Sequence, residues 1–266
     1  DSDDAFMFYA LANELIETDE LRFEHVLSDI ESLNREAFEG TYEVTAVSIH
    51  AYAHLDDRYA LLGSGASMGD GYGPVLVARE AIGPEGLADK RVAIPGRLTS
   101  ASLALKMWNP ALQTVTLAFD EIMPAVASCE VDAGVVIHEG QLTWMDEGFH
   151  KIVDLGEWWA EETGGLPLPL GGNVIRRDLG DEMCGRVAAL LKDSIEYSLK
   201  HRDEALDYAI DYGRGLDRDK ADRFVGMYVN NLTVDYGERG KKAMRAFLDR
   251  AFEERLIPKV PQLDFL

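Results

Sequence analysis

The sequence predicts an α/β protein that folds into two lobes with mostly parallel sheets and ends in a helical segment. Within residues 1–163, short apolar runs of strand length alternate with segments of helical spacing in two successive sets. A stretch rich in glycine and proline follows at Gly164–Gly172, and beyond it apolar residues recur only at helical spacing. Alternating strands and helices form sheets covered by helices, and two such sets indicate two lobes.

The first set of elements occupies residues 1–82. A helix is expected across Asp29–Phe38, because Ser28 and Glu31 have the Ser-x-x-Glu spacing of a capping box. Four short runs with the composition of strands are expected to form the first sheet: Leu21–Leu27, Val44–Ile49, Tyr59–Leu62 and Pro74–Ala78.

The second set repeats the order β-α-β-α-β and is followed by helices alone. Amphipathic helices are expected at Asp181–Lys200 and Glu238–Leu256, where apolar residues return every three or four positions. The second set itself consists of a strand at Arg91–Pro95, a helix at Thr99–Trp108, a strand at Thr114–Ala118, a helix at Asp120–Cys129 and a strand at Ala133–His138.

Two segments rich in glycine or proline are expected to connect the lobes. Gly83–Lys90 leads into the second lobe and Pro167–Gly172 leads back. The first lobe then comprises residues 1–82 and 172–266, the second comprises residues 83–171, and a ligand cleft lies between them. A chain that enters the second lobe once and returns has the plan of a type II periplasmic-binding-protein-like fold, in which hinge closure encloses the ligand.

The composition favours a small-molecule partner. With 26 Lys and Arg against 48 Asp and Glu, the formal net charge is −22, so neither a nucleic acid nor a membrane surface is expected as a partner. No apolar run reaches the roughly 20 residues of a membrane-spanning helix. Cys129 and Cys184 lie far apart and outside any C-x-x-C motif, which indicates a reducing compartment, the cytoplasm, and no zinc ribbon. The sequence leaves the oligomeric state open.

Polar residues at strand ends and helix starts are the candidates for ligand binding. Helix N-termini expose N–H groups that favour an anion, and in this fold they line the cleft. In the opening segment Ser2 or Asp3 is a natural N-cap, and capping alone is the competing role for these residues. Ser48 ends a strand. The five glycines of Gly63–Gly73 either let the backbone approach a ligand or form a flexible surface loop, and both readings stay open.

The segment Pro95–Ser102 is the most informative by position, because it follows a strand and opens a helix. Thr99 is expected to cap that helix, so that the N–H groups of Ser100 and Ala101 point outward as a cradle for a carboxylate or a hydroxyl. Arg97 lies near this cradle, although a solvated arginine is the commoner outcome.

Histidines supply the candidate acid–base chemistry. His138 closes a strand, and an imidazole that faces a cleft can act as a general base or acid near neutral pH, with a structural role as the alternative. His50 and His54 are spaced to share one face of a helix, but no carboxylate at ligand spacing accompanies them, so no metal is expected. The pattern alone predicts a two-lobed small-molecule binder with a candidate base.

Ordered segments along nearly the whole chain carry a resemblance to a known family. They are Asp3–Phe6 (DDAF), Gly71–Pro74 (GYGP), Pro95–Ala101 (PGRLTSA), Val131–Glu139 (VDAGVVIHE) and Thr163–Gly172 (TGGLPLPLGG), with Tyr228–Asn230 and Gly237–Gly240 near the end. With this ordered set the chain resembles the 1,4-dihydroxy-6-naphthoate synthase family of the futalosine route to menaquinone.

The resemblance implies a fold, a reaction and a site. The family has the two-lobed binding-protein fold, and its members cleave cyclic dehypoxanthinylfutalosine to 1,4-dihydroxy-6-naphthoate without a metal or an organic cofactor. By this resemblance His138 is the catalytic base, which deprotonates a sugar hydroxyl and starts a retro-aldol-like fragmentation. The residues that it implies for binding the anionic substrate are Asp3, Asp4, Ser48, Thr99, Ser100 and Ala101.

Two alternatives use the same fold. A non-catalytic solute-binding protein would hold a small carboxylate in the same cleft, and a sister enzyme of the pathway dehydrates chorismate. The strand end Ile137-His138-Glu139 and the Leu-Pro-Leu-Pro-Leu-Gly-Gly run favour the naphthoate enzyme.

Overall fold

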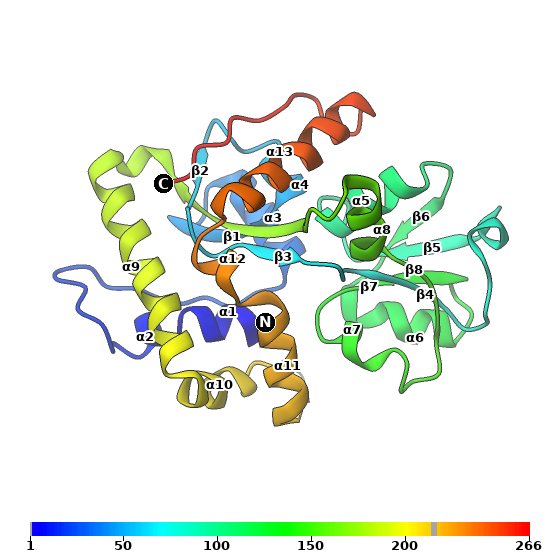
Figure 1. Ribbon diagram of the computed structural model, residues 1–266, viewed down its shortest axis with the longest axis horizontal. Helices are drawn as coiled ribbons and strands as arrows, with labels where there is room; N and C mark the ends of the chain where they lie inside the picture. The colour runs from blue at the N-terminus through cyan, green and yellow to red at the C-terminus, as the bar shows by residue number, and fades with distance from the viewer. Residues whose placement is uncertain (1, 214–216) are drawn as a thin grey trace.

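The computed structural model describes residues 2–213 and 217–266 and shows two β-sheets along the long axis of the molecule (Figure 1). The α/β fold class is confirmed. The first sheet has the order β1-β9-β2, with β3 also paired with β9: β1 (Val44–Ser48), β2 (Tyr59–Leu61), β3 (Ser67–Gly69) and β9 (Leu168–Arg176). The second has the order β6-β5-β7-β4-β8: β4 (Val75–Ala78), β5 (Arg91–Ile94), β6 (Gln113–Thr116), β7 (Ala133–Val136) and β8 (His150–Asp154).

Fewer strand pairings are parallel than the sequence predicts. Among the strand pairings of the described residues, β5 is parallel to β6 and to β7, whereas the other five pairings are antiparallel. In the first sheet β9 lies between β1 and β2 and runs opposite to both. The prediction of mostly parallel sheets is therefore wrong, because strands that carry the chain between two sheets run against their neighbours. Alternation of strands and helices in the sequence does not reveal this reversal.

The chain crosses between the sheets at other positions than those predicted. Strand β4 pairs with β7 and β8, so the first crossing lies between β3 and β4, at residues 70–74. The segment Gly83–Lys90 instead joins β4 to β5 within the second sheet and contains a 3₁₀ helix at Pro84–Leu87. On the return, Leu168 and Pro169 already pair with β3 in the first sheet. Glycine and proline mark a change of direction without specifying which sheet the next strand joins.

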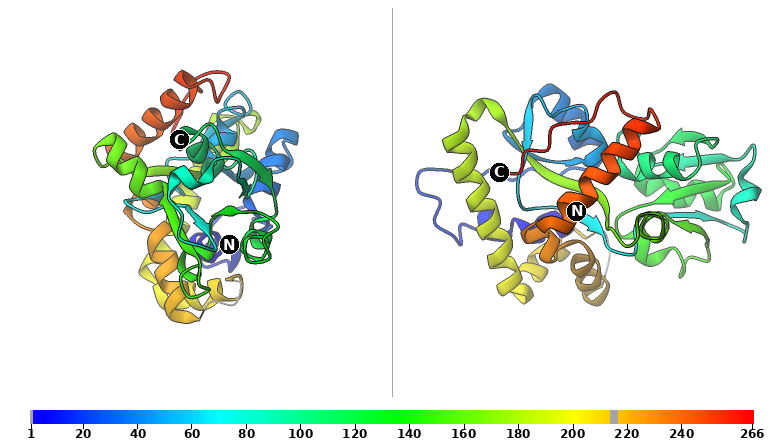
Figure 2. Two further views of the ribbon diagram at one scale, coloured as in Figure 1. Left: turned by 90° about the vertical axis from the view of Figure 1, so that its right-hand side faces the viewer. Right: turned by 45° about the horizontal axis from the view of Figure 1, so that its top comes forward.

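Helices cover both sheets and form the C-terminal part of the chain, as the sequence predicts. In Figure 1 and in the right-hand view of Figure 2, α9 and α10 lie on the side of the first sheet that is remote from the second. None of the described helices is long and apolar enough to cross a membrane. The α-helices are α1 (Ser2–Met7), α2 (Tyr9–Ala12), α3 (Ile30–Glu39), α4 (Ile49–Tyr52), α5 (Ser100–Trp108), α6 (Ile122–Ala127), α7 (Gly140–Thr143), α8 (Leu155–Thr163), α9 (Asp181–Lys200), α10 (Arg202–Ile210), α11 (Arg218–Tyr228), α12 (Asn231–Val234) and α13 (Gly237–Glu253).

Helix α3 is capped by a different residue from the one predicted. Asp29 is the N-cap: its Oδ1 accepts the Ser32 N–H at 3.0 Å, and the Ser32 hydroxyl donates to Oδ2 at 2.6 Å. The predicted capping box of Ser28 and Glu31 is therefore wrong. An aspartate one position later offers a charged acceptor, which makes the stronger cap.

The run Leu21–Leu27 forms no strand. Phe23 packs in the apolar cluster that contains Leu11, and Leu27 packs in the cluster that contains Phe6, so these side chains are partly buried although the backbone joins no sheet. Strand propensity reflects the fit of side chains to a half-buried surface, and helices together with the first sheet provide that surface here.

One large apolar cluster connects the two sheets. It includes Leu61 and Phe247 next to the first sheet and Val92 and Trp159 next to the second. The ring of Trp159 meets that of Phe247 edge-on, with 5.4 Å between the ring centres. Burial of each such large side chain stabilises the fold by about 1.5–3 kcal/mol, so the two sheets share a packed boundary where α8 meets α13.

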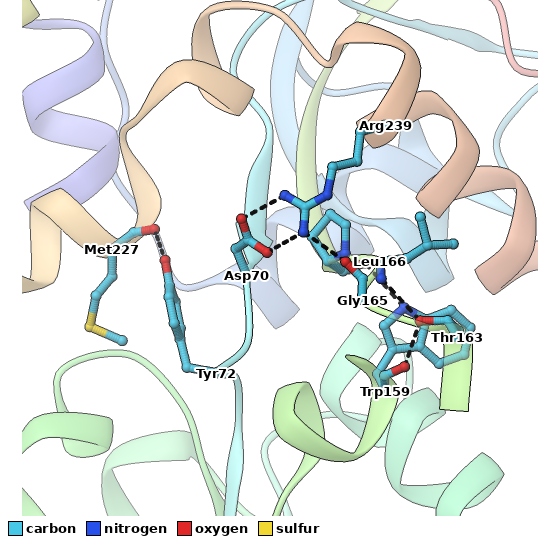
Figure 3. Close-up of polar contacts among 9 residues, drawn as sticks. Asp70, Tyr72, Trp159, Thr163, Gly165, Leu166, Met227 and Arg239 are labelled. Carbon is cyan, nitrogen blue, oxygen red and sulfur yellow. Dashed lines mark hydrogen bonds and ion pairs between the residues drawn. The ribbon is translucent and has the colours of Figure 1, made fainter. Parts of the chain in front are cut away.

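Arg239 on α13 contacts both crossings (Figure 3). Its guanidinium donates to the two carboxylate oxygens of Asp70 in the first crossing, at 2.7 and 2.6 Å, and to Gly165 O in the return crossing, at 2.7 Å. Tyr72, also in the first crossing, donates to Met227 O at the end of α11. Because a bidentate arginine–carboxylate pair restricts geometry, α13 holds the two connecting segments side by side.

Candidate active site

A cavity of about 100 Å³ lies where elements of the two sheets meet. Helix α1 and strands β1 and β9 line it from the first sheet, and the start of α5 and the residues after β7 line it from the second. The structure thus brings together residues from distant parts of the chain. The base and the six binding residues that the family resemblance implies all line this cavity: Asp3, Asp4, Ser48, Thr99, Ser100, Ala101 and His138.

The N-terminus of α5 is anchored so that its first N–H groups stay available. Thr99 is the N-cap, as predicted: its hydroxyl accepts the Ser102 N–H at 3.2 Å and donates to Gly96 O at 3.0 Å. The Ser100 hydroxyl donates to Leu170 O on β9 at 2.6 Å, which ties the helix to the first sheet. The N–H groups of Ser100 and Ala101 have no partner within the helix, and together with the helix dipole they favour an anion.

Ser48 is positioned by Asn34 of α3. The Asn34 amide oxygen accepts the Ser48 N–H at 2.8 Å, and its nitrogen donates to Ser48 Oγ at 3.0 Å. Both residues are buried. Because Oγ accepts from Asn34, the hydroxyl proton of Ser48 is directed elsewhere and can be donated to a ligand in the cavity.

His138 lies two residues beyond β7 with a backbone φ of +54°. This left-handed conformation is uncommon for residues other than glycine and is found where the surrounding structure enforces it. Strand β7 therefore ends at Val136, two residues before the end that the sequence predicts. The His138 ring packs edge-on against Phe119 at 4.9 Å between ring centres, and it lines the cavity.

Gln141 holds the backbone of His138. Its amide oxygen accepts the His138 N–H at 3.2 Å, and its amide nitrogen lies 2.7 Å from Gly73 O in the first crossing. The same amide is hydrogen-bonded to the Tyr228 hydroxyl at 2.6 Å. Burial raises the pKa of Tyr228 well above its ordinary value, so the phenol stays neutral. Through Gln141, the crossing and α11 together support the backbone that presents His138.

Asp3 is a buried acid of the cavity. Its side chain is 9% exposed, and Oδ1 has no hydrogen-bond partner among the described residues. Burial, and then the neighbouring Asp4 carboxylate, raise the pKa of Asp3 to about 6, while His138 acts in the opposite direction. The protonated carboxyl therefore persists at pH values where an exposed aspartate is fully ionised, and it can donate as well as accept a hydrogen bond.

Replacing Asp3 with asparagine is expected to remove a pH dependence of stability. The folded-state pKa of about 6 lies above the ordinary value of 3.8, so the contribution of the neutral carboxyl is complete below pH 4 and is lost as the pH rises through 6. The loss amounts to at most about 3 kcal/mol. The free energy of urea unfolding, measured at pH 4.5 and pH 7, should fall more for the wild type than for Asp3→Asn. Equal falls in the two proteins would contradict the raised pKa.

The remaining histidine pair has a structural environment. His50 is buried, and its Nδ1 lies 3.3 Å from Thr99 O. Burial lowers the pKa of His50 to about 4, so its ring is neutral at physiological pH. The rings of His50 and His54 are 5.9 Å apart. In the part of the chain that the structure describes, no group of three His, Cys, Asp or Glu side chains could hold a metal ion.

Several cavity residues were not found by reasoning from the sequence. Asn173, a lone amide within the apolar strand β9, offered a signal, because a polar residue inside such a run requires a partner or a ligand. Asn34, which positions Ser48 without lining the cavity itself, lies on a helix and offered none. Arg97, considered near the α5 cradle, is exposed and does not line the cavity. Of the glycine-rich segment, Gly65 lines the cavity.

Two sheets joined by two crossings, with a cavity at their boundary, define a protein of the periplasmic-binding-protein-like class. The alkanesulfonate-binding protein SsuA from Xanthomonas axonopodis pv. citri has the same fold, with a TM-score of 0.69. The two are 14% identical, and the match covers 98% of this chain and 93% of that chain. A likeness at this identity concerns the fold alone.

The chain belongs to the menaquinone biosynthesis family, whose model matches residues 1–253. It is 40% identical over 260 residues to the 1,4-dihydroxy-6-naphtoate synthase of Thermus thermophilus, a match that covers 97% of this chain and 94% of the relative. A crystal structure of a protein from Archaeoglobus fulgidus is 49% identical and matches with a TM-score of 0.92 over 97% of this chain and 96% of that chain. The family resemblance inferred from the sequence is confirmed.

Proposed function

We propose that this protein is a carbon–carbon lyase that converts cyclic dehypoxanthinylfutalosine to 1,4-dihydroxy-6-naphthoate in the cytoplasm. Membership of the menaquinone biosynthesis family and 40% identity to the Thermus enzyme support the reaction. The observation that carries the proposal is the placement of His138 and the N-terminus of α5 in one cavity. The proposed reaction uses neither a metal nor an organic cofactor.

Neutral donors hold the anionic substrate. None of the described residues that line the cavity is Lys or Arg. The substrate carboxylate is therefore bound by the N–H groups of Ser100 and Ala101 with the support of the helix dipole. Ser48 donates its hydroxyl to a second oxygen. Asp3 and Asp4, which repel a carboxylate when ionised, face the hydroxyl-bearing part of the substrate.

His138 acts as the general base. Its imidazole takes the proton of a sugar hydroxyl, and the O–H electron pair forms a carbonyl while the adjacent C–C bond breaks. The electron pair of that bond passes into the ring system and onto its carbonyl oxygen as the ring becomes aromatic, and the imidazolium then returns its proton to that oxygen, while the other fragment leaves as the neutral carbonyl compound. General acid–base catalysis of this kind accelerates a reaction by about 10²–10⁴.

Closure of two lobes shields the reaction from water. We place the lobe boundaries at the crossings, residues 70–74 and 164–167, instead of at Gly83–Lys90, because β4 belongs to the second sheet. These short connecting segments absorb the rotation, and the closed cavity excludes water from the reactive intermediates.

The reaction is tested directly with purified protein. Incubation with cyclic dehypoxanthinylfutalosine, in buffer with and without EDTA, should yield 1,4-dihydroxy-6-naphthoate at equal rates, as measured by chromatography and mass. Chorismate serves as a parallel substrate, because the sister enzyme of the fold dehydrates it. Turnover of chorismate alone would assign the sister activity, and binding without turnover of either compound would indicate a solute-binding protein.

A further inference from the structure

Asn173 on β9 has a side chain that the structure leaves unused. Its backbone pairs with Ala46 of β1 and accepts the Leu62 N–H at 2.9 Å. Its side chain is 2% exposed and lines the cavity of the candidate active site. Among the described residues, none accepts a hydrogen bond from its Nδ2. A buried amide donor without an acceptor lowers stability unless a ligand supplies one.

Gly65 leaves the room that this amide occupies. A Cβ atom at position 65 would lie 2.0 Å from Asn173 Nδ2, well inside contact distance. Gly65 also has a φ of +83° and donates its N–H to Thr233 O at 2.7 Å. One glycine of the Gly63–Gly73 segment is thus required next to the Asn173 amide, on the cavity side.

Asn173 stands where the active-site cavity meets a second cavity. The second cavity has a volume of about 130 Å³ and is largely apolar, with Phe8, Leu11 and Phe23 among its walls. The residues that line both cavities are Asp4, Ser28, Leu33, Ala46 and Asn173. A substrate that extends from His138 toward the second cavity passes among these shared residues, of which Asn173 offers the unpaired donor.

We propose that Asn173 is a substrate-binding residue that donates a hydrogen bond from Nδ2 to a carbonyl or hydroxyl oxygen of the substrate at this junction. An amide suits the position, because it offers a donor without a charge at a junction that Asp4 also lines. The role rests on the proposed function, and it adds a specificity contact that selects substrates with an oxygen at the junction. A site built to pair a polar group discriminates against analogues that lack it.

The first test compares Asn173→Leu with the wild type. Leucine has a similar size and offers no donor, so KM should rise about tenfold with kcat changed less than about threefold, as for a contact made equally in ground and transition states. The melting temperature should stay the same or rise, because the unpaired donor is gone. A structural role would lower it. Asn34→Leu is the matched control: that amide is fully paired with Ser48, so its loss should lower the melting temperature.

The second test uses the neighbouring glycine. Gly65→Ala displaces the Asn173 amide and should also raise KM. In an Asn173→Ala background the amide is already absent, so adding Gly65→Ala should raise KM little further. The two substitutions then give a non-additive double-mutant cycle. Additive effects would overturn the proposal, as would an unchanged KM in Asn173→Leu.

Binding of 1,4-dihydroxy-6-naphthoate, measured by calorimetry, separates this proposal from the reaction. Suppose that the wild type does not turn over the substrate but binds the naphthoate about tenfold more tightly than Asn173→Leu does. The proposed reaction is then wrong, and the proposed hydrogen bond from Asn173 is supported. Equal affinity overturns the contact. A wild type that neither turns over the substrate nor binds the naphthoate overturns both.

Discussion

His138→Gly is expected to lower kcat at least about a hundredfold, the contribution of a positioned general base, while the protein stays folded. Glycine is the informative replacement because His138 has a φ of +54°, which glycine adopts without strain. The substitution removes the ring and leaves its space in the cavity. Added imidazole should therefore restore part of the lost rate, as measured by naphthoate formation at rising imidazole concentration.

Two variants control for this effect. His138→Asn keeps a side chain that tolerates the left-handed backbone but has no titratable ring, so it should lose as much rate as the glycine variant. His150→Asn makes the same change at an exposed histidine of β8 and should retain full activity. A His138→Asn variant with more than about a tenth of the wild-type rate would rule out the base, because removal of a general base costs more than that.

The sequence predicts most elements of this fold because apolar periodicity records which side chains are buried. Strands β1 and β5 and helix α5 lie within a residue or two of their predicted bounds. The failure at Leu21–Leu27 has the same origin, since alternate side chains of that run are partly buried in apolar clusters without its backbone joining a sheet. Apolar periodicity predicts which side chains are buried, but it does not predict which segment the backbone hydrogen-bonds to.

Strand direction and sheet membership depend on contacts between distant parts of the chain. Strand β9 pairs with β1 and β2, which precede it by more than a hundred residues, and no local pattern at Leu168–Arg176 specifies those partners. The displaced crossing before β4 has the same cause. Local turn chemistry predicts that the chain bends, and tertiary packing decides where it goes.

The candidate site divides along the same line. The cap at Thr99 follows from local sequence, and the structure has it as predicted. The support of His138 does not, because the Gln141 amide meets the hydroxyl of Tyr228, 87 positions away. The position of the Asn173 side chain is likewise not predictable from local sequence, because its neighbour Gly65 lies in the distant segment between β2 and β3.

Ala101→Asp should raise KM for the anionic substrate at least about a hundredfold in a protein that still folds. Ala101 is buried at the second position of α5 and lines the cavity. An aspartate there is stabilised by the helix dipole, by about 0.3–1 kcal/mol. The same carboxylate competes with the substrate for the helix N–H groups and adds negative charge to a cavity that already contains Asp3 and Asp4. Because the cost of burying a carboxylate opposes the helix-dipole term, the loss of binding is expected to exceed the change in stability.

Ala101→Asn separates charge from size. Its side chain has nearly the shape of aspartate and no charge, so it should raise KM by no more than about tenfold, the effect of crowding and of one lost hydrogen bond. Steady-state kinetics and calorimetric binding of the naphthoate measure both variants, and thermal unfolding shows that each is folded. If both variants weaken binding equally, the α5 N-terminus excludes them by volume and does not bind the carboxylate. If KM differs at least tenfold between the two variants, the helix N-terminus binds the negatively charged group of the substrate. No lysine or arginine among the described cavity residues is then needed to bind that charge.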